Sequence, residues 1–145
     1  MASMSQIEFQ ATRTRGLSRA QAGTVAGGVR VLLRLEGFAT LAATVALYAH
    51  AGFSWPAFAL FFLAPDLAML AYLFGPRAGA MGYNLAHTYV LALGLALAGL
   101  FAGVPIAAAG GLIWAAHIGF DRGLGYGLKY PSGFGDTHLG RIGRH

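Results

Sequence analysis

Residues 104–124 read VPIAAAGGLIWAAHIGFDRGL, an apolar run that also carries His117 and Asp121 near its end. A helix needs about 20 predominantly apolar residues to cross roughly 30 Å of bilayer hydrocarbon. An ionisable side chain in that hydrocarbon costs roughly 2.5–3.5 kcal/mol on insertion scales. The run therefore predicts a membrane-spanning helix whose polar side chains have either a function or a polar partner.

Three similar apolar runs precede this one, at Val31–Ala49, Trp55–Phe74 and Tyr83–Phe101. Backbone groups in lipid must pair within their own segment, so runs of this length are expected to be helices. Turn residues separate them: Ser54 is the predicted N-cap of the second helix, Gly75-Pro76 ends it, and Gly103 precedes Pro105. The sequence thus predicts an all-α, integral-membrane four-helix bundle with short hairpin loops.

The composition agrees with a membrane protein. The 145-residue chain is 57% hydrophobic and only 10% charged, with a mean hydropathy of +0.60, whereas soluble domains average about 25% charged residues. There is no cysteine, which excludes disulfides, thiolate metal ligands and cysteine nucleophiles. The net charge of +5 comes from Arg and Lys in tails and short loops, so we expect a lipid bilayer rather than nucleic acid as the partner.

The basic residues also predict an orientation. Arg30 and Arg34 open the first predicted helix, Arg77 lies in the second predicted loop, and Arg122 and Lys129 lie at or beyond the end of the fourth helix. The first and third loops carry none. Because cytoplasmic flanks of membrane helices are enriched in Arg and Lys, we expect a multi-pass protein of the cell membrane with both termini in the cytoplasm.

Three segments are expected along the chain. Residues 1–28 are expected to form a polar, basic and disordered tail, residues 29–124 the four-span bundle, and residues 125–145 a cytoplasmic segment rich in glycine and aromatic residues. For the last segment two interpretations stay open. It is either a solvated tail, or it folds back under the bundle and brings Asp136 and His138 toward the polar residues described below.

Small residues recur at a spacing of four, which lets helix backbones approach closely in membranes. The examples are Gly94 and Ala98, Gly99 and Gly103, and the series Gly119, Gly123 and Gly127. They indicate close helix packing, and such faces would also serve a homo-oligomer.

Six polar side chains in the apolar runs form the candidate site: Glu36, Asp66, Asn84, His87, His117 and Asp121. At a rise of 1.5 Å per residue, all six are expected within roughly 10 Å of one level, in the cytoplasmic part of the bilayer. His117 and Asp121 share a helix face at i and i+4, as do Tyr83 and His87. Pro65 is expected to bend the helix beside Asp66. The sequence therefore predicts one shared site, with Tyr83, Asp136 and His138 as accessory residues.

Several segments, in this order, resemble the small bacterial integral-membrane family called domain of unknown function 4260. They are Leu33-Arg34-Leu35-Glu36-Gly37, Leu63-Ala64-Pro65-Asp66, Tyr83-Asn84-Leu85-Ala86-His87-Thr88-Tyr89, His117-Ile118-Gly119-Phe120-Asp121-Arg122, Gly127-Leu128-Lys129-Tyr130-Pro131 and Asp136-Thr137-His138-Leu139-Gly140. The resemblance covers about residues 31–142. It implies a multi-span membrane protein and no particular activity.

Four interpretations of the polar cluster stay open. Its histidines and carboxylates are ligands suited to a divalent metal such as zinc, iron or manganese, and a metal with an open position would activate water or dioxygen. The alternatives are proton- or ion-coupled transport and a structural polar network without ligand. A haem held by His87 and His117 is less favoured, because carboxylates lie nearby. Whether the protein is an enzyme stays open. If it is one, Asp66 or Asp121 is the expected general base.

Overall fold

The computed structural model describes residues 4, 6, 8–10 and 24–142, so most of the tail predicted over residues 1–28 lies outside the described residues. It is 74% helical with almost no strand, which confirms the all-α prediction. The helices and strands are α2 (Gly27–His50), α3 (Trp55–Phe61), the 3₁₀ helix η1 (Ala64–Phe74), α4 (Pro76–Ala86), α5 (Tyr89–Ala102), α6 (Pro105–Leu124), β1 (Asp136–Thr137) and β2 (Gly140–Arg141).

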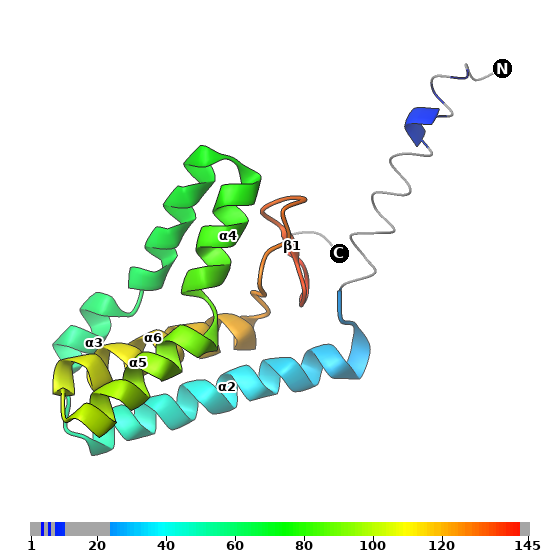
Figure 1. The fold of residues 1–145 in the computed structure, drawn as a ribbon. Helices are drawn as coiled ribbons and strands as arrows, with labels where there is room; N and C mark the ends of the chain where they lie inside the picture. The colour runs from blue at the N-terminus through cyan, green and yellow to red at the C-terminus, as the bar shows by residue number, and fades with distance from the viewer. Residues whose placement is uncertain (1–3, 5, 7, 11–23, 143–145) are drawn as a thin grey trace.

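Helix α6 is the centre of the arrangement and packs against both α2 and α5. Helices η1 and α4 pack along each other as a hairpin that rises steeply from this group (Figure 1). The antiparallel strands β1 and β2 lie beside α4 and the start of α2, where the Val25 backbone N–H donates to the carbonyl of His138 at 2.9 Å. The chain after α6 is therefore folded back onto the helices.

Glycines bring the central helices close together. A Cβ added to Gly111 of α6 would lie 2.2 Å from the backbone nitrogen of Ala96, and one on Gly37 of α2 would lie 2.7 Å from that of Gly123. Neither site has room for a side chain. A Cβ on Gly94, by contrast, would meet no atom within 4 Å. Of the glycines in the predicted pairs, Gly99, Gly119 and Gly123 are likewise closely packed, so part of the predicted packing occurs inside one chain.

Two of the predicted helix boundaries are confirmed. The Ser54 hydroxyl accepts a hydrogen bond from the Ala57 backbone N–H at 3.4 Å and so caps α3. Gly103 ends α5 with a φ of 66°, a left-handed conformation that glycine adopts without strain, and α6 begins two residues later at Pro105.

The second predicted loop was wrong, because residues 76–82 are helical. Helix α4 begins at Pro76, and the single residue Gly75 separates it from η1. Proline is tolerated in the first helical turn, where its missing N–H has no intrahelical partner. Gly79 is a contact point rather than a turn residue, since a Cβ there would lie 2.2 Å from the Tyr72 ring. Arg77 consequently lies in the first turn of α4 instead of a loop.

Two of the predicted helices are interrupted. The run Trp55–Phe74 breaks after α3 and resumes as η1 with Pro65 in its first turn, because proline cannot continue an α-helix through its interior. The predicted third helix is likewise divided, since α4 ends at Ala86 and α5 begins at Tyr89. The apolar run predicted His87 in the first turns of the third helix. In the structure, His87 instead directly follows the last residue of α4.

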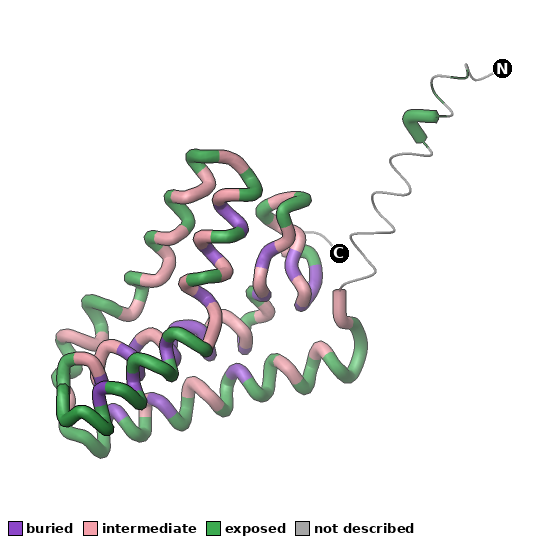
Figure 2. The backbone as a smooth tube through the Cα atoms, viewed as in Figure 1, coloured by how far each residue is buried: buried purple, intermediate pink, exposed green. Residues whose placement is uncertain are grey.

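Three stretches are long and apolar enough to cross a membrane: Gly27–His50, Trp55–Phe74 and Pro76–Ala102. These stretches expose large apolar side chains, such as Leu60 at 74% and Phe101 at 89%. Ten of the 20 residues of α6 are buried instead, and Figure 2 shows purple concentrated where α2, α5 and α6 meet. The apolar exterior suggests a lipid environment, and His117 of α6 is enclosed by protein.

Candidate metal centre

Four of the predicted site residues converge in the interior: Asp66 of η1, His87 after α4, and His117 and Asp121 of α6. One ligand atom from each can be chosen so that all four lie within 4.8 Å of one another. The two imidazoles are buried, at 2% and 1% exposed, whereas the Asp66 side chain is 32% exposed. We refer to these four residues as the Asp-His cluster; it is closed by protein on the imidazole side and more open at Asp66.

Local structure aims these side chains at one point. Asp66 lies in the first turn of η1, directly after Pro65. His117 and Asp121 are one turn apart on the face of α6 that meets the end of α4. The carbonyl of His87 accepts a hydrogen bond from Arg122 at 3.1 Å, which satisfies a free carbonyl at the C-terminus of α4 and fixes that end against α6.

The distances within the cluster match those between the ligands of one metal ion. His87 Nε2 lies 3.2 Å from His117 Nε2, 3.4 Å from Asp66 Oδ1 and 3.6 Å from Asp121 Oδ2. His117 Nε2 lies 3.6 Å from Asp66 Oδ1 and 3.9 Å from Asp121 Oδ2. Bonds of about 2.0–2.2 Å in a tetrahedron put ligand atoms about 3.3–3.6 Å apart. The cluster is close to that size and slightly wider at Asp121.

The hydrogen bond at Nδ1 of His87 determines which tautomer the neutral imidazole adopts. Its Nδ1 lies 2.9 Å from the backbone carbonyl of Tyr83, and a carbonyl only accepts, so Nδ1 carries the hydrogen. In the neutral ring, Nε2 then presents a lone pair toward the carboxylates of Asp66 and Asp121. Three acceptors facing one another repel unless a cation, either a metal ion or a proton, lies between them.

His117 differs from His87 in this respect. Its Nδ1 is buried, and no hydrogen-bond partner for it exists in the part of the chain that the structure describes. Without a metal, a hydrogen on His117 Nε2 can be donated to His87 Nε2 across the 3.2 Å that separates them. The same nitrogen is the one that would bind a metal ion, so metal and proton compete for it.

Tyr83, predicted as an accessory residue, supports two members of the cluster. Its hydroxyl donates to Asp121 Oδ2 at 3.0 Å. Its ring is stacked on His87, with centroids 3.7 Å apart and planes within 10°. Such contacts orient metal ligands without binding the metal themselves.

Two of the six predicted residues are not in the cluster. Glu36 is exposed on α2 and lines a separate cavity of about 180 Å³ with Tyr89 and Arg122. The Asn84 side chain instead holds the backbone of Lys129: its amide donates to the Lys129 carbonyl at 2.9 Å, and its oxygen accepts from the Lys129 N–H at 2.7 Å. Asn84 therefore attaches the C-terminal segment to α4.

The C-terminal segment is folded back, but it does not bring Asp136 and His138 into the cluster. Asp136 accepts from the Ser132 hydroxyl at 2.8 Å. His138 Nδ1 accepts from the Leu128 backbone N–H at 2.9 Å, and burial together with the Arg122 charge lowers the pKa of its ring. These contacts hold the segment in place, so we assign both residues to the segment's own structure.

A cavity of about 490 Å³ adjoins the cluster and is lined by Asp66, His117 and Asp121 together with Tyr83 and Lys129. Lys129 is 4% exposed, and burial lowers its pKa. From the sequence, Lys129 was predicted only as part of the cytoplasmic flank. The available signal was that this single lysine lies in a segment of glycines and aromatic residues, a composition suited to packing.

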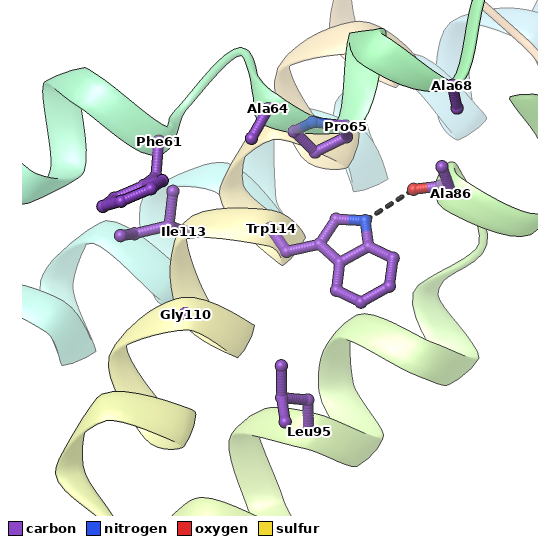
Figure 3. A pocket seen from close by; sticks show the side chains of 9 residues that line it. All are labelled: Phe61, Ala64, Pro65, Ala68, Ala86, Leu95, Gly110, Ile113 and Trp114. Carbon is purple, nitrogen blue, oxygen red and sulfur yellow. Dashed lines mark hydrogen bonds between the residues drawn. The ribbon is translucent and has the colours of Figure 1, made fainter.

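A second, apolar cavity of about 400 Å³ lies between η1, α5 and α6. Figure 3 shows Pro65, Leu95 and Trp114 on its walls, with the Trp114 indole N–H donating to the carbonyl of Ala86. Since Ala86 precedes His87 directly, this hydrogen bond adds to the support of the cluster from α6.

The donor set and spacing disfavour haem. The Nε2 atoms of His87 and His117 are 3.2 Å apart and both are next to carboxylate oxygens. A porphyrin held between two axial histidines would need an apolar plane between those nitrogens. A small ion, bound by two nitrogens and two oxygens, fits the arrangement.

The fold and site define a helical protein with an apolar exterior and a buried Asp-His cluster. Residues 30–142 match the family described as Domain of unknown function (DUF4260), and the chain belongs to that family. The matched region contains the whole cluster and Lys129. No curated protein and no solved structure matches the chain.

Proposed function

We propose that this protein binds one divalent metal ion, of the zinc, iron or manganese type, between Asp66, His87, His117 and Asp121. The observation that carries the proposal is the lone pair of His87 Nε2, which faces carboxylates at 3.4 and 3.6 Å while its Nδ1 hydrogen is held by a carbonyl. A bound cation relieves this repulsion and uses all four groups. Two imidazoles and two carboxylates are also the borderline-to-hard ligands that these metals prefer.

The metal would lie at the boundary between the protein interior and the adjoining cavity. Asp66 and Asp121 are partly exposed, whereas both histidines are buried. A coordination position on the cavity side would let the ion contact a second molecule, which is how metal ions polarise carbonyl groups or activate water. The residues described here supply the ion's binding and orientation.

For the membrane, we propose four spans with both termini in the cytoplasm, residues 29–124 forming the bundle and residues 125–145 a cytoplasmic segment. The support is the placement of charge. The start of α2, the end of α6 and the tip of the η1–α4 hairpin carry the basic residues, whereas the loops after α2 and α5 carry none. In Figure 1 these two loops lie together at the opposite end from the start of α2.

Elemental analysis of detergent-purified protein tests the metal proposal. We expect about one metal ion per chain in the parent and its loss from Asp66→Asn and His117→Ala. Glu36→Gln is the matched control: it removes an acidic side chain that lies outside the cluster, so its metal content should equal the parent's. A parent that takes up no zinc, iron(II) or manganese when these are supplied would overturn the proposal.

The 3.2 Å contact between His87 and His117 favours a second candidate, a structural network held by shared protons. In that case Asp66→Asn and His117→Ala would lower the melting temperature with no ion to lose. Ion-coupled transport has less support, because the hydroxyls of Thr40 and Thr44 bond to carbonyls of their own helix and do not extend the polar cluster outward. Flux measurements in vesicles would detect it.

A further inference from the structure

Lys129 is a buried cation without a carboxylate partner. It is 4% exposed, and its ammonium donates to the Phe134 carbonyl at 3.0 Å and lies over two aromatic rings, 3.7 Å from the Phe134 centroid and 4.6 Å from that of Tyr83. No ion pair between Lys129 and a described carboxylate exists. Buried charges are normally paired, so a partner from outside the chain is expected.

The charges around the cavity sum to a positive value once a metal is bound. A divalent ion is neutralised by Asp66 and Asp121, and the two imidazoles add no charge. Lys129, which lines the same cavity, then contributes an uncompensated positive charge. The metal-loaded cavity is therefore suited to an anion.

The cavity is also amphipathic. Its most buried lining residues are polar or ionisable: Tyr83, His117 and Lys129 are between 1% and 4% exposed. Its most exposed lining residues are hydrophobic, with Leu63 at 61% exposed and Leu124 at 46%. A molecule that entered from lipid would meet an apolar rim first and polar groups at the end.

We propose that this cavity binds a single-chain amphiphile with an anionic head group, a carboxylate or a phosphate. The head group accepts a hydrogen bond from the Lys129 ammonium near the metal, and the acyl chain lies along Leu63 and Leu124 toward the lipid. The volume of about 490 Å³ is within the range of about 300–1,000 Å³ of small-ligand sites and suits one chain rather than two. The inference deepens the proposed metal site and rests on it for its charge.

Equilibrium binding to the protein in phosphatidylcholine nanodiscs, followed by native mass spectrometry, tests this site. The probes are oleate, oleoyl lysophosphatidate and oleyl alcohol, which share one chain and differ in the head group. We expect at least one of the anions to bind about 10-fold more tightly than the alcohol, the effect of one charge-assisted hydrogen bond. The stronger of the two identifies the head group, and equal binding of all three would overturn the proposal.

Variants assign the effect to Lys129. Lys129→Met should reduce binding of the anion to the level of the alcohol, leave the alcohol unchanged and keep the metal content of the parent. Lys129→Arg preserves the charge and should retain most of the preference, which separates lost charge from lost packing. Arg141→Met is the matched control, because Arg141 is a 67% exposed cation in the same C-terminal segment. A preference that survives Lys129→Met would contradict the assignment.

Metal analysis of the same samples separates this inference from the proposed function. A protein that holds metal but binds anion and alcohol equally has the metal site and lacks the amphiphile site. A protein without metal that still prefers the anion through Lys129 has an amphiphile site that depends on Lys129 alone, and the metal proposal fails together with the charge argument based on it. A protein with neither property overturns both.

Discussion

Tyr83 makes three contacts with the candidate ligands. Its hydroxyl donates to Asp121, its ring stacks on His87, and its carbonyl accepts the Nδ1 hydrogen of His87. The backbone contact survives any side-chain change, so the hydroxyl can be removed while the form of the His87 ring is kept. A substitution of Tyr83 therefore tests how much a contact to the candidate ligands contributes to metal affinity, without removing a candidate ligand.

For Tyr83→Phe we expect the metal to bind about 10-fold more weakly, at the lower end of the effect of losing such a supporting contact. Competition with a chromophoric chelator measures the affinity. Tyr72→Phe is the control, since the Tyr72 hydroxyl is buried and has no hydrogen-bond partner in the described part of the chain. Equal affinities of Tyr83→Phe and the parent would show that the hydroxyl does not support the site.

All four residues that converge are recognisable in the sequence, because ionisable groups are conspicuous in apolar runs. The predicted site also included Glu36, which lies elsewhere. The reason is rotational: each helical residue advances about 100° around the axis. The neighbouring residue Gly37 packs directly against α6, whereas Glu36 is exposed and lines the separate cavity. Which face of α2 meets α6 depends on packing, and polarity alone did not reveal it.

Among the elements, the β1–β2 hairpin has a pH-dependent contact. His138 accepts a hydrogen bond from Leu128, and burial followed by the Arg122 charge lowers its pKa below the ordinary value of 6.5. The unfolded segment therefore takes up a proton at a higher pH than the folded one. The stability from this contact is complete above about pH 6.5 and decreases as the pH falls toward the folded-state pKa.

We expect amide hydrogen exchange in residues 125–142, corrected for intrinsic rates, to be faster at about pH 5.5 than at about pH 7.5. His138→Gln keeps a side-chain acceptor but cannot titrate, so it should remove the difference. His50→Gln, at the exposed end of α2, is the control and should leave it unchanged. Exchange that is independent of pH in the parent would contradict the role of His138.

The packing of α6 against α5 gives a matched pair of substitutions at adjacent residues. Gly111→Ala places a Cβ 2.2 Å from the backbone of Ala96, whereas a Cβ on Gly110 meets nothing within 4 Å. We expect Gly111→Ala to lose about 1–3 kcal/mol of stability by overpacking. Thermal unfolding in detergent measures this loss. Gly110→Ala should melt at or slightly above the temperature of the parent, and equal melting of both variants would contradict the close approach.

Helix boundaries were the part of the fold that sequence patterns predicted least well. Gly75-Pro76 was interpreted as the start of a loop. In the structure, Gly75 alone connects η1 to α4, and Pro76 is the first residue of α4. Proline is compatible with both a loop and a first helical turn. The distinction came from the Tyr72 ring, which packs on Gly79, a tertiary contact that local patterns do not contain.

Among the described residues, the helices expose many large apolar side chains, whereas the two histidines of the Asp-His cluster are buried. Figure 2 shows the outward sides of α2 and α5 exposed, and these helices carry apolar side chains there, such as Leu35 and Leu97. Helix α6, which holds two candidate ligands, is not among the stretches apolar enough to cross a membrane by composition. Because α2 and α5 cover it, it does not need an apolar surface on every side.

The absence of cysteine makes the topology directly testable with single-cysteine variants. We place Ala51→Cys in the loop after α2 and Ser132→Cys in the C-terminal segment, at exposed positions. In intact cells, a membrane-impermeant maleimide should label Ala51→Cys, whereas Ser132→Cys should react only after permeabilisation. Labelling of both in intact cells would contradict the proposed orientation, and the parent is the unlabelled control.

The central position of α6 has a consequence for biosynthesis. The ribosome makes α2, α3, η1, α4 and α5 first, so Asp66 and His87 are synthesised before His117 and Asp121 exist. Until α6 is made, Gly37 of α2 lacks the helix that packs against it, and the first two candidate ligands have no partners from α6. In the proposed metal site, loading would therefore follow synthesis of the last helix, and a nascent chain stalled before α6 would expose unpacked surface of the kind that quality control recognises.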